Sequence, residues 1–262
     1  MAHGLRDDAR SPRPGVALRP PRAAEGPIVS SLGSRRPLVI ATGLSVIAGI
    51  TDVTSWLLLG GFFSAHVTGN VVVLAADAVD GRAPGVASLL AVPVFIAVAV
   101  VATLVSARMR GDDRRRTAAL LGAQAALLTV AAGLSFTTTA SDDPGAPLAV
   151  VIGLCAVAAM AAQNAYLHLV HGMSFTTAVM TGNLVTATVS GISSLRDPSD
   201  QASRRRWNDT WPIVAGFIAG CVVGAAAAGL LSDRAAVVPA VLAIALLVAV
   251  TATDRTDVPA PA

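Results

Sequence analysis

The chain has 262 residues, of which 54% are hydrophobic and 13% are charged, with a formal net charge of +3 at pH 7. Soluble domains usually carry about 25% charged residues, so about half of the usual charge is missing. Several apolar runs approach the roughly 20 residues needed to cross a hydrocarbon core of about 30 Å. This composition excludes a soluble enzyme, a disulfide-stabilised secreted domain and a disordered chain. It predicts an all-α polytopic membrane protein.

The chain begins with a polar tail. Residues 1–36 are rich in Arg, Pro, Gly and Ser and show no apolar periodicity. Such a segment buries too little apolar surface to offset its ordering entropy, so we expect it to be disordered and cytoplasmic. The membrane domain is expected over 37–252, followed by a short C-terminal tail over 253–262. The arginines lie in the tail and loops, where the positive-inside bias explains them without a nucleic-acid partner.

Eight apolar segments follow the tail, and two of them are short. They cover approximately 38–59, 67–80, 88–108, 117–136, 147–170, 178–194, 211–231 and 235–252. Both short segments carry the tripeptide Thr-Gly-Asn within a shared pattern, F-x-[ST]-A-x-x-T-G-N. The pattern places Phe62, Ser64, Ala65, Thr68, Gly69 and Asn70 on Phe175, Thr177, Ala178, Thr181, Gly182 and Asn183. The sequence therefore predicts two homologous halves, about 38–136 and 148–252.

Loop charges predict that the two halves are inverted. The loop 81–87 has one Arg, whereas its counterpart 195–210 has four. The next pair has the opposite bias, with five Arg in 108–116 and one in 232–234. Because cytoplasmic loops carry the excess of Arg, equivalent loops lie on opposite sides, which requires three crossings per half. We expect six crossings of the cell membrane, two re-entrant or broken helices and cytoplasmic termini; the alternative is eight crossings.

Paired interrupted segments in corresponding positions are the best sequence indication of a transporter site. Re-entrant backbone is tolerated only where protein or water surrounds it, and helix N-termini near the midplane favour an anion or a dipolar solute. Gly permits a close approach, Asn both donates and accepts, and Thr caps a helix or bonds a permeant. The alternative is a helix cap inside a packed bundle. The predicted solute site or pore is formed by Thr68, Gly69, Asn70, Thr181, Gly182 and Asn183.

An ionisable residue lies inside the first crossing. Asp52 aligns with Asn164 of the second half, next to Gln163, and we include all three in the predicted site. A charge at the membrane centre costs at least about 2.5 kcal/mol on insertion scales and by default faces a cavity or a partner. Asp52 either binds a cation, proton or solute, or accepts N–H groups of a Thr-Gly-Asn turn. His66, whose counterpart is Val179, either gates or shuttles protons or is a satisfied polar residue.

The other motifs indicate packing rather than chemistry. Gly216, Gly220 and Gly224 stand four residues apart, a spacing that lets another helix approach closely, either within the bundle or in a homo-oligomer. His168 and His171 share a helix face, but no Cys, Asp or Glu accompanies them, so we expect no metal site. No P-loop or hydrolase motif occurs. We therefore expect no enzymatic activity and no cofactor.

The repeated motif resembles that of a known family. Its residues are Phe63-Ser64-Ala65-His66-Val67-Thr68-Gly69-Asn70, Gln163-Asn164-Ala165 and Thr176-Thr177-Ala178-Val179-Met180-Thr181-Gly182-Asn183-Leu184. They are similar to those of the YoaK-like family of bacterial membrane proteins, over about residues 36–252. The resemblance implies a multi-spanning membrane unit of unknown function, with permease activity as one expectation and no established substrate.

Three functions stay open. The first, which we favour, is a channel or secondary transporter for an unknown small solute. The second is a membrane scaffold or accessory subunit, for which the glycine ladder and basic loops would suffice. The third is an intramembrane enzyme that uses Asp52 and His66, although the sequence offers no obvious pair of nucleophile and base.

Overall fold

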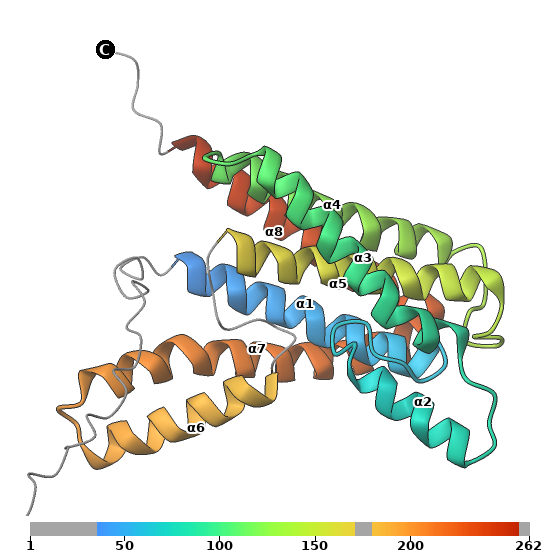
Figure 1. Ribbon diagram of the computed structural model, residues 1–262, viewed down its shortest axis with the longest axis horizontal. Helices are drawn as coiled ribbons and strands as arrows, with labels where there is room; N and C mark the ends of the chain where they lie inside the picture. The colour runs from blue at the N-terminus through green and yellow to red at the C-terminus, as the bar shows by residue number, and fades with distance from the viewer. Residues whose placement is uncertain (1–35, 171–179, 257–262) are drawn as a thin grey trace, which may run out of the picture. The chain divides into compact units, whose positions relative to one another are not determined.

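The computed structural model describes residues 36–170 and 180–256, and every regular element in these two ranges is a helix (Figure 1). The elements are α1 (Arg36–Leu58), α2 (Gly69–Val79), α3 (Val86–Arg108), α4 (Asp113–Leu134), α5 (Pro147–Leu169), α6 (Met180–Arg196), α7 (Gln201–Leu231), the 3₁₀ helix η1 (Ser232–Ala236) and α8 (Val237–Thr256). The prediction of an all-α polytopic fold is confirmed. Each of the eight predicted apolar segments corresponds to one α-helix.

Five stretches of the described chain are long and apolar enough to cross a membrane. They are α1, α3, α4, α5 and the stretch 201–253, which joins α7, η1 and α8. The short turn of η1 divides that last stretch into two long helices. By contrast, α2 has 11 residues and α6 has 17, fewer than the roughly 20 that span a hydrocarbon core. The structure thus contains the six long and two short helices that the sequence predicts.

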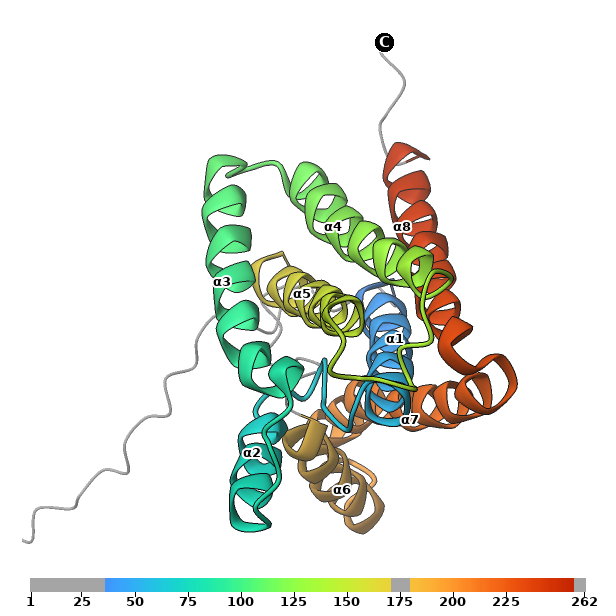
Figure 2. The same ribbon diagram turned by 90° about the vertical axis from the view of Figure 1, so that its right-hand side faces the viewer.

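The central helices of the bundle are α1 and α5 (Figure 2). In the windows that could span a membrane, 67% of α1 and 78% of α5 are buried, compared with 17% of α3. The helix α7 packs along α1 and α3 along α5, while α4 contacts both α5 and α8. The two short helices lie outside this core, with α2 on α3 and α6 on α7. The two central helices are also those that bear Asp52 and Gln163.

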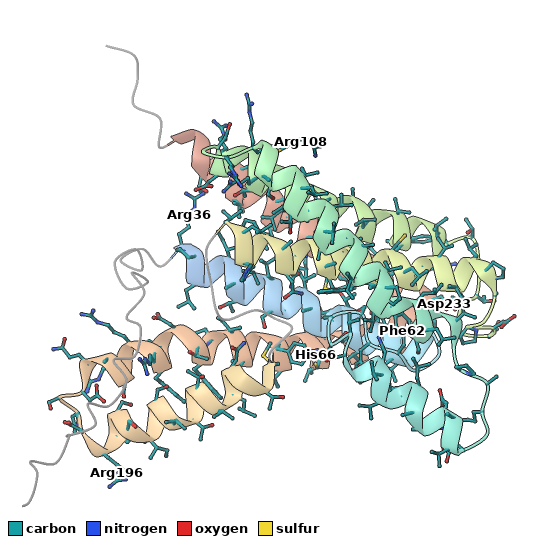
Figure 3. The ribbon with its side chains drawn as sticks, viewed as in Figure 1. Arg36, Phe62, His66, Arg108, Arg196 and Asp233 are labelled. Atoms are coloured by element: carbon teal, nitrogen blue, oxygen red, sulfur yellow. The ribbon has the colours of Figure 1, made fainter. Side chains whose placement is uncertain are left out.

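The two ends of the bundle carry different residues (Figure 3). Arg36 and Arg196 lie at one end, where the Arg36 guanidinium donates to the carbonyl of Val250 at 2.9 Å. Asp233 lies at the other end, where its carboxylate accepts the backbone N–H of Ser141 at 2.8 Å. We call these the arginine-rich end and the Asp233 end.

The helix α7 begins ten residues before its predicted apolar run, at Gln201 instead of 211. Its first turns hold three consecutive arginines, so hydropathy could not identify them as part of the helix. Asp200 caps the start, because its carboxylate accepts the backbone N–H of Ser203 at 3.0 Å. Hydrogen bonds from Ser203 also hold the pKa of Asp200 below its usual value. The Asp200 cap therefore explains why α7 starts at Gln201, before its apolar run.

Glycines allow α1 and α7 to pack closely. A Cβ atom added at Gly216 would lie 3.0 Å from the carbonyl oxygen of Thr42, and one at Gly224 would lie 2.9 Å from Cα of Ile50. Gly220, between them, would overlap the backbone of α1 in the same way. The contacts advance in step along both helices, so α1 and α7 run in the same direction. The predicted glycine ladder therefore faces another helix of its own chain.

Candidate functional site

The segment between α1 and α2 turns back into the bundle. After the end of α1, Gly60 and Gly61 have φ angles of 87° and 75°, in the left-handed region that glycine adopts without a Cβ penalty. The chain returns until His66 lies beside Asp52, which stands six residues, or about 9 Å, before the end of α1. The helix α2 then starts at Gly69 and runs toward the Asp233 end (Figure 3). It is therefore a half-helix that begins in the interior.

The carboxylate of Asp52 holds this returning segment. Its Oδ1 accepts the backbone N–H groups of Ser64 at 2.9 Å and Ala65 at 2.6 Å. Its Oδ2 lies 2.5 Å from Nδ1 of His66. Asp52 is only 3% exposed, and a buried carboxylate needs such pairing. Of the two roles left open by the sequence, these bonds correspond to the second, in which Asp52 accepts N–H groups before the Thr-Gly-Asn turn.

The imidazole of His66 joins the returning segment to α7. Its ring packs edge-on against Phe217, with 4.9 Å between the ring centroids, and its side chain is 27% exposed. Nδ1 of the ring contacts the carboxylate of Asp52, whereas Nε2 makes no hydrogen bond to any residue within 36–170 or 180–256. Nε2 is therefore available to exchange a hydrogen bond with a solute.

Asn70 closes the turn that precedes α2. Its Oδ1 accepts the backbone N–H of Phe63 at 2.7 Å, and its Nδ2 donates to the carbonyl of the same residue at 2.8 Å. The side chain of Asn70 is fully buried. A Cβ at Gly69 would lie 2.9 Å from Cδ2 of Phe63, which explains the glycine. Thr68 makes no capping hydrogen bond and is exposed, so it is the member of the motif that faces outward.

We expect Asn70→Ala to destabilise the chain by about 2 kcal/mol or more, because it leaves the N–H and C=O groups of Phe63 without partners. Thermal unfolding in mild detergent measures this loss. Asn208→Ala is the control, since Asn208 is exposed on α7. Equal unfolding temperatures for the two variants would show that the Asn70 amide does not hold the turn.

The second Thr-Gly-Asn motif has a similar burial pattern. Thr181 and Gly182 are exposed, whereas Asn183 is 2% exposed and lies on the buried face of the first turn of α6. The preceding motif residues, Phe175 to Val179, lie outside the described residues, as does His171. The motif members that face outward are therefore a threonine and a glycine in the second half, and a threonine in the first.

The two short helices begin at about the same level along α7. Only four residues link α6 to α7, and Gly191 packs against the ring of Trp207, so the two helices are antiparallel neighbours. Eleven residues back along α6 from Gly191 is Met180, and eleven residues forward along α7 from Trp207 is the turn that contains Phe217. Because His66 contacts Phe217, the starts of α2 and α6 lie close to the same level.

Gln163 lies deeper in the bundle and ties three helices together. Its Oε1 accepts from Nε2 of Gln124 on α4 at 2.7 Å, and its Nε2 donates to the carbonyl of Leu44 on α1 at 3.1 Å. Asn164 donates to the carbonyl of Met160 at 2.9 Å, within α5. Sequence reasoning missed Gln124, although a glutamine within an apolar run is itself a signal of a buried polar partner.

A small cavity lies near the Asp233 end, among α1, α4, α5, η1 and α8. Its volume is about 30 Å³, which is room for about one water molecule. Its polar lining residues are Thr51, Thr54, Ser55, Ser135 and Asp233. The cavity could not be predicted from the sequence because its walls come from segments that are far apart in the chain.

The chain matches a family model that has no assigned activity. The model is described as Protein of unknown function (DUF1275), and it matches residues 40–249, which are 210 of the 262 residues. No curated protein matches the chain, and no solved structure does. Within the two described ranges, no group of three or more His, Cys, Asp or Glu side chains is placed to hold a metal ion.

Proposed function

The chain belongs to the DUF1275 family of proteins of unknown function, and we propose that it is a permease for a small solute, acting as a channel or secondary transporter. The proposed site lies where α2 and α6 begin, beside His66 and Phe217. The observation that carries the proposal is that two short helices, one from each half, begin at about the same level along α7, as the contacts of His66 with Phe217 and of Gly191 with Trp207 indicate. Interrupted helices in corresponding positions are typical of transporter sites.

The helix contacts support an inverted repeat. Exchanging the halves converts α1, α2, α3 and α4 into α5, α6, α7 and α8. Under this exchange the pair α1–α7 becomes α5–α3, α1–α8 becomes α5–α4, and α2–α3 becomes α6–α7, while α1–α5 and α4–α8 are unchanged; all of these pairs are in contact. Equivalent helices also run in opposite directions, as α1 and α5 do in Figure 1. Parallel halves with eight crossings would place equivalent helices in the same direction.

The charge difference between the two ends supports an orientation. The arginine-rich end includes the loops 108–116 and 195–210, with nine arginines between them. By the positive-inside rule this end faces the cytoplasm. Both termini of the membrane domain are then cytoplasmic, and the loops 81–87 and 137–146 are outside.

Single cysteines on a Cys155→Ala/Cys221→Ala background test this topology. We expect Arg82→Cys to react with a membrane-impermeant maleimide from outside intact cells. We expect Arg204→Cys to react only after the membrane is permeabilised. Reaction of both cysteines from the same side would refute the inverted repeat, and with it the meeting of the two short helices.

Solute flux into proteoliposomes tests the activity. For a transported solute found in a panel of ions, amino acids, sugars and small neutral molecules, Thr68→Val and Thr181→Val should each lower the flux about tenfold, because each removes one hydrogen bond worth about 1.4 kcal/mol. Thr103→Val is the control, since this exposed hydroxyl bonds the carbonyl of Ala99 on its own helix. If no solute moves, a scaffold or accessory subunit explains the chain better.

A further inference from the structure

We propose that a groove between α6 and α7 binds an anionic phospholipid, with an acyl chain in the groove and the lipid phosphate at Arg196 and Arg204. The groove lies toward the arginine-rich end of the bundle, away from the place where α2 and α6 begin. It is therefore a site for a lipid partner, separate from the proposed solute site.

The groove has a volume of about 320 Å³ and apolar walls. On the α6 side, Ile192 is 54% exposed and Leu195 is 77% exposed. On the α7 side, the walls are Trp207 and Trp211. The hydroxyls of two further lining residues are already engaged, because Thr188 donates to the carbonyl of Leu184 at 2.9 Å and Ser194 to that of Gly191 at 2.8 Å. The groove therefore suits a lipid chain, which is as apolar as a leucine side chain.

Two stacked tryptophans indicate the depth of the groove in the membrane. The rings of Trp207 and Trp211 lie 5.2 Å apart between centroids, with 7° between their planes. Three consecutive arginines precede Trp207, and the apolar run of α7 begins at 211. Tryptophan is enriched where headgroups meet acyl chains. The groove therefore lies at that boundary, with its far walls at the level of the acyl chains.

Two exposed arginines lie at the headgroup end of the groove. Arg196 ends α6 (Figure 3), directly after Leu195, and it makes no hydrogen bond or ion pair to any residue within 36–170 or 180–256. Arg204 stands three residues before Trp207, on the same face of α7. Its Nη2 donates to the carbonyl of Pro198 at 3.0 Å, which leaves other guanidinium donors for a ligand. Arginine binds phosphate through such paired N–H groups.

The charges around the groove leave these two arginines for an anion. Residues 196–209 contain four arginines and three aspartates, a formal charge of +1. Asp200 interacts with Arg206, and Asp209 interacts with Arg205. The third aspartate, at position 197, accepts the backbone N–H and the hydroxyl of the serine two residues later, at 2.9 and 2.6 Å. An anionic headgroup is therefore favoured over a zwitterionic one.

Quenching of tryptophan fluorescence by brominated lipids tests the site. The chain has three tryptophans, and Trp56→Phe leaves the two that line the groove. The full chain with this change is placed in phosphatidylcholine vesicles that contain equal shares of either brominated phosphatidylcholine or brominated phosphatidylglycerol, with the same acyl chains. We expect the anionic lipid to quench more strongly, with an affinity at least about fivefold higher than that of the zwitterionic lipid.

Arginine variants locate the headgroup. Arg196→Gln and Arg204→Gln should each lower the preference for the anionic lipid about fivefold, which corresponds to the roughly 1 kcal/mol that one arginine contributes near an anionic surface. Arg114→Gln is the matched control, because it removes the same charge from an exposed position in the other arginine-rich loop, and it should keep the preference. Thermal unfolding checks that each variant is folded. If Arg204→Gln is not, because this side chain also bonds Pro198, Arg196→Gln decides the result.

Three results would overturn the lipid site. Equal quenching by the two brominated lipids would mean that the tryptophans belong to an ordinary aromatic belt. No quenching by either lipid would mean that protein covers the groove, as a second copy of the chain would. A preference that survives in the folded arginine variants, or that falls equally in Arg114→Gln, would mean that the headgroup is not held at the groove. The measurement needs no transported solute, so its result is independent of the flux that tests the permease.

Discussion

Replacing Gly220 by alanine is expected to destabilise the folded chain by about 2–3 kcal/mol, the upper part of the range for overpacked sites. The added Cβ would overlap the carbonyl oxygen of Val46 and lie 3.0 Å from Cα of the same residue. These are backbone atoms of α1, so no side chain can rotate to make room, and the whole helix has to move. The loss is expected although alanine favours a helix over glycine by about 1 kcal/mol.

Gly229→Ala is the matched control because it makes the same change in the same helix. A Cβ at Gly229 would meet no atom within 4 Å, so only the helix propensity changes, and the variant should be as stable as the wild type or up to about 1 kcal/mol more stable. Thermal unfolding followed by circular dichroism in mild detergent compares the two. Equal stabilities would mean that α1 and α7 are not held at this distance.

The helices could be predicted because their apolar runs are long and separated by charged loops. The exception is the start of α7. There the Asp200 cap and the packing of Trp207 on Gly191 stabilise a helical stretch that contains three arginines and lies before the apolar run. Hydropathy measures the preference for lipid, and it does not report helix that continues into water. The boundary error therefore lies where the helix leaves the apolar region.

The candidate site could be predicted in part. The spacing of the two Thr-Gly-Asn motifs identified where α2 and α6 begin, and the cost of a buried charge identified Asp52 as a residue with partners. The sequence could not identify the partners of Asn70, because a bond to the backbone of Phe63 depends on how the turn closes. The contact of Gln124 with Gln163 joins two helices and likewise required the tertiary structure.

The two halves use related positions in different ways. Asp52 in α1 binds the returning segment, and Gln163, one residue before its counterpart in α5, links α4 and α1. A polar side chain inside the membrane is costly to insert into lipid, so it is expected where its hydrogen bonds hold a segment of the chain in position. Here the bonds of Asp52 fix the start of α2, and the bonds of Gln163 fix the centre of the bundle. A solute path between the halves would need both of these parts to stay in place.

Asp52→Ala is expected to destabilise the chain by about 3–5 kcal/mol, as loss of one partner from a buried charged pair typically does. The change leaves the backbone N–H groups of Ser64 and Ala65 without their acceptor and His66 without its carboxylate. Asp77→Ala is the control: this carboxylate on α2 pairs with exposed Arg82 in the loop that follows the helix, and a surface pair contributes at most about 1 kcal/mol.

Asp52→Asn separates the structural role of the carboxylate from its charge. The amide oxygen can still accept the N–H groups of Ser64 and Ala65, so this variant should keep most of the stability that Asp52→Ala loses. Unfolding temperatures of Asp52→Asn and Asp52→Ala, measured under the same conditions, distinguish the two roles. If Asp52→Asn were as unstable as Asp52→Ala, the charged pairing with His66 would be what holds the turn, and an amide could not replace the carboxylate.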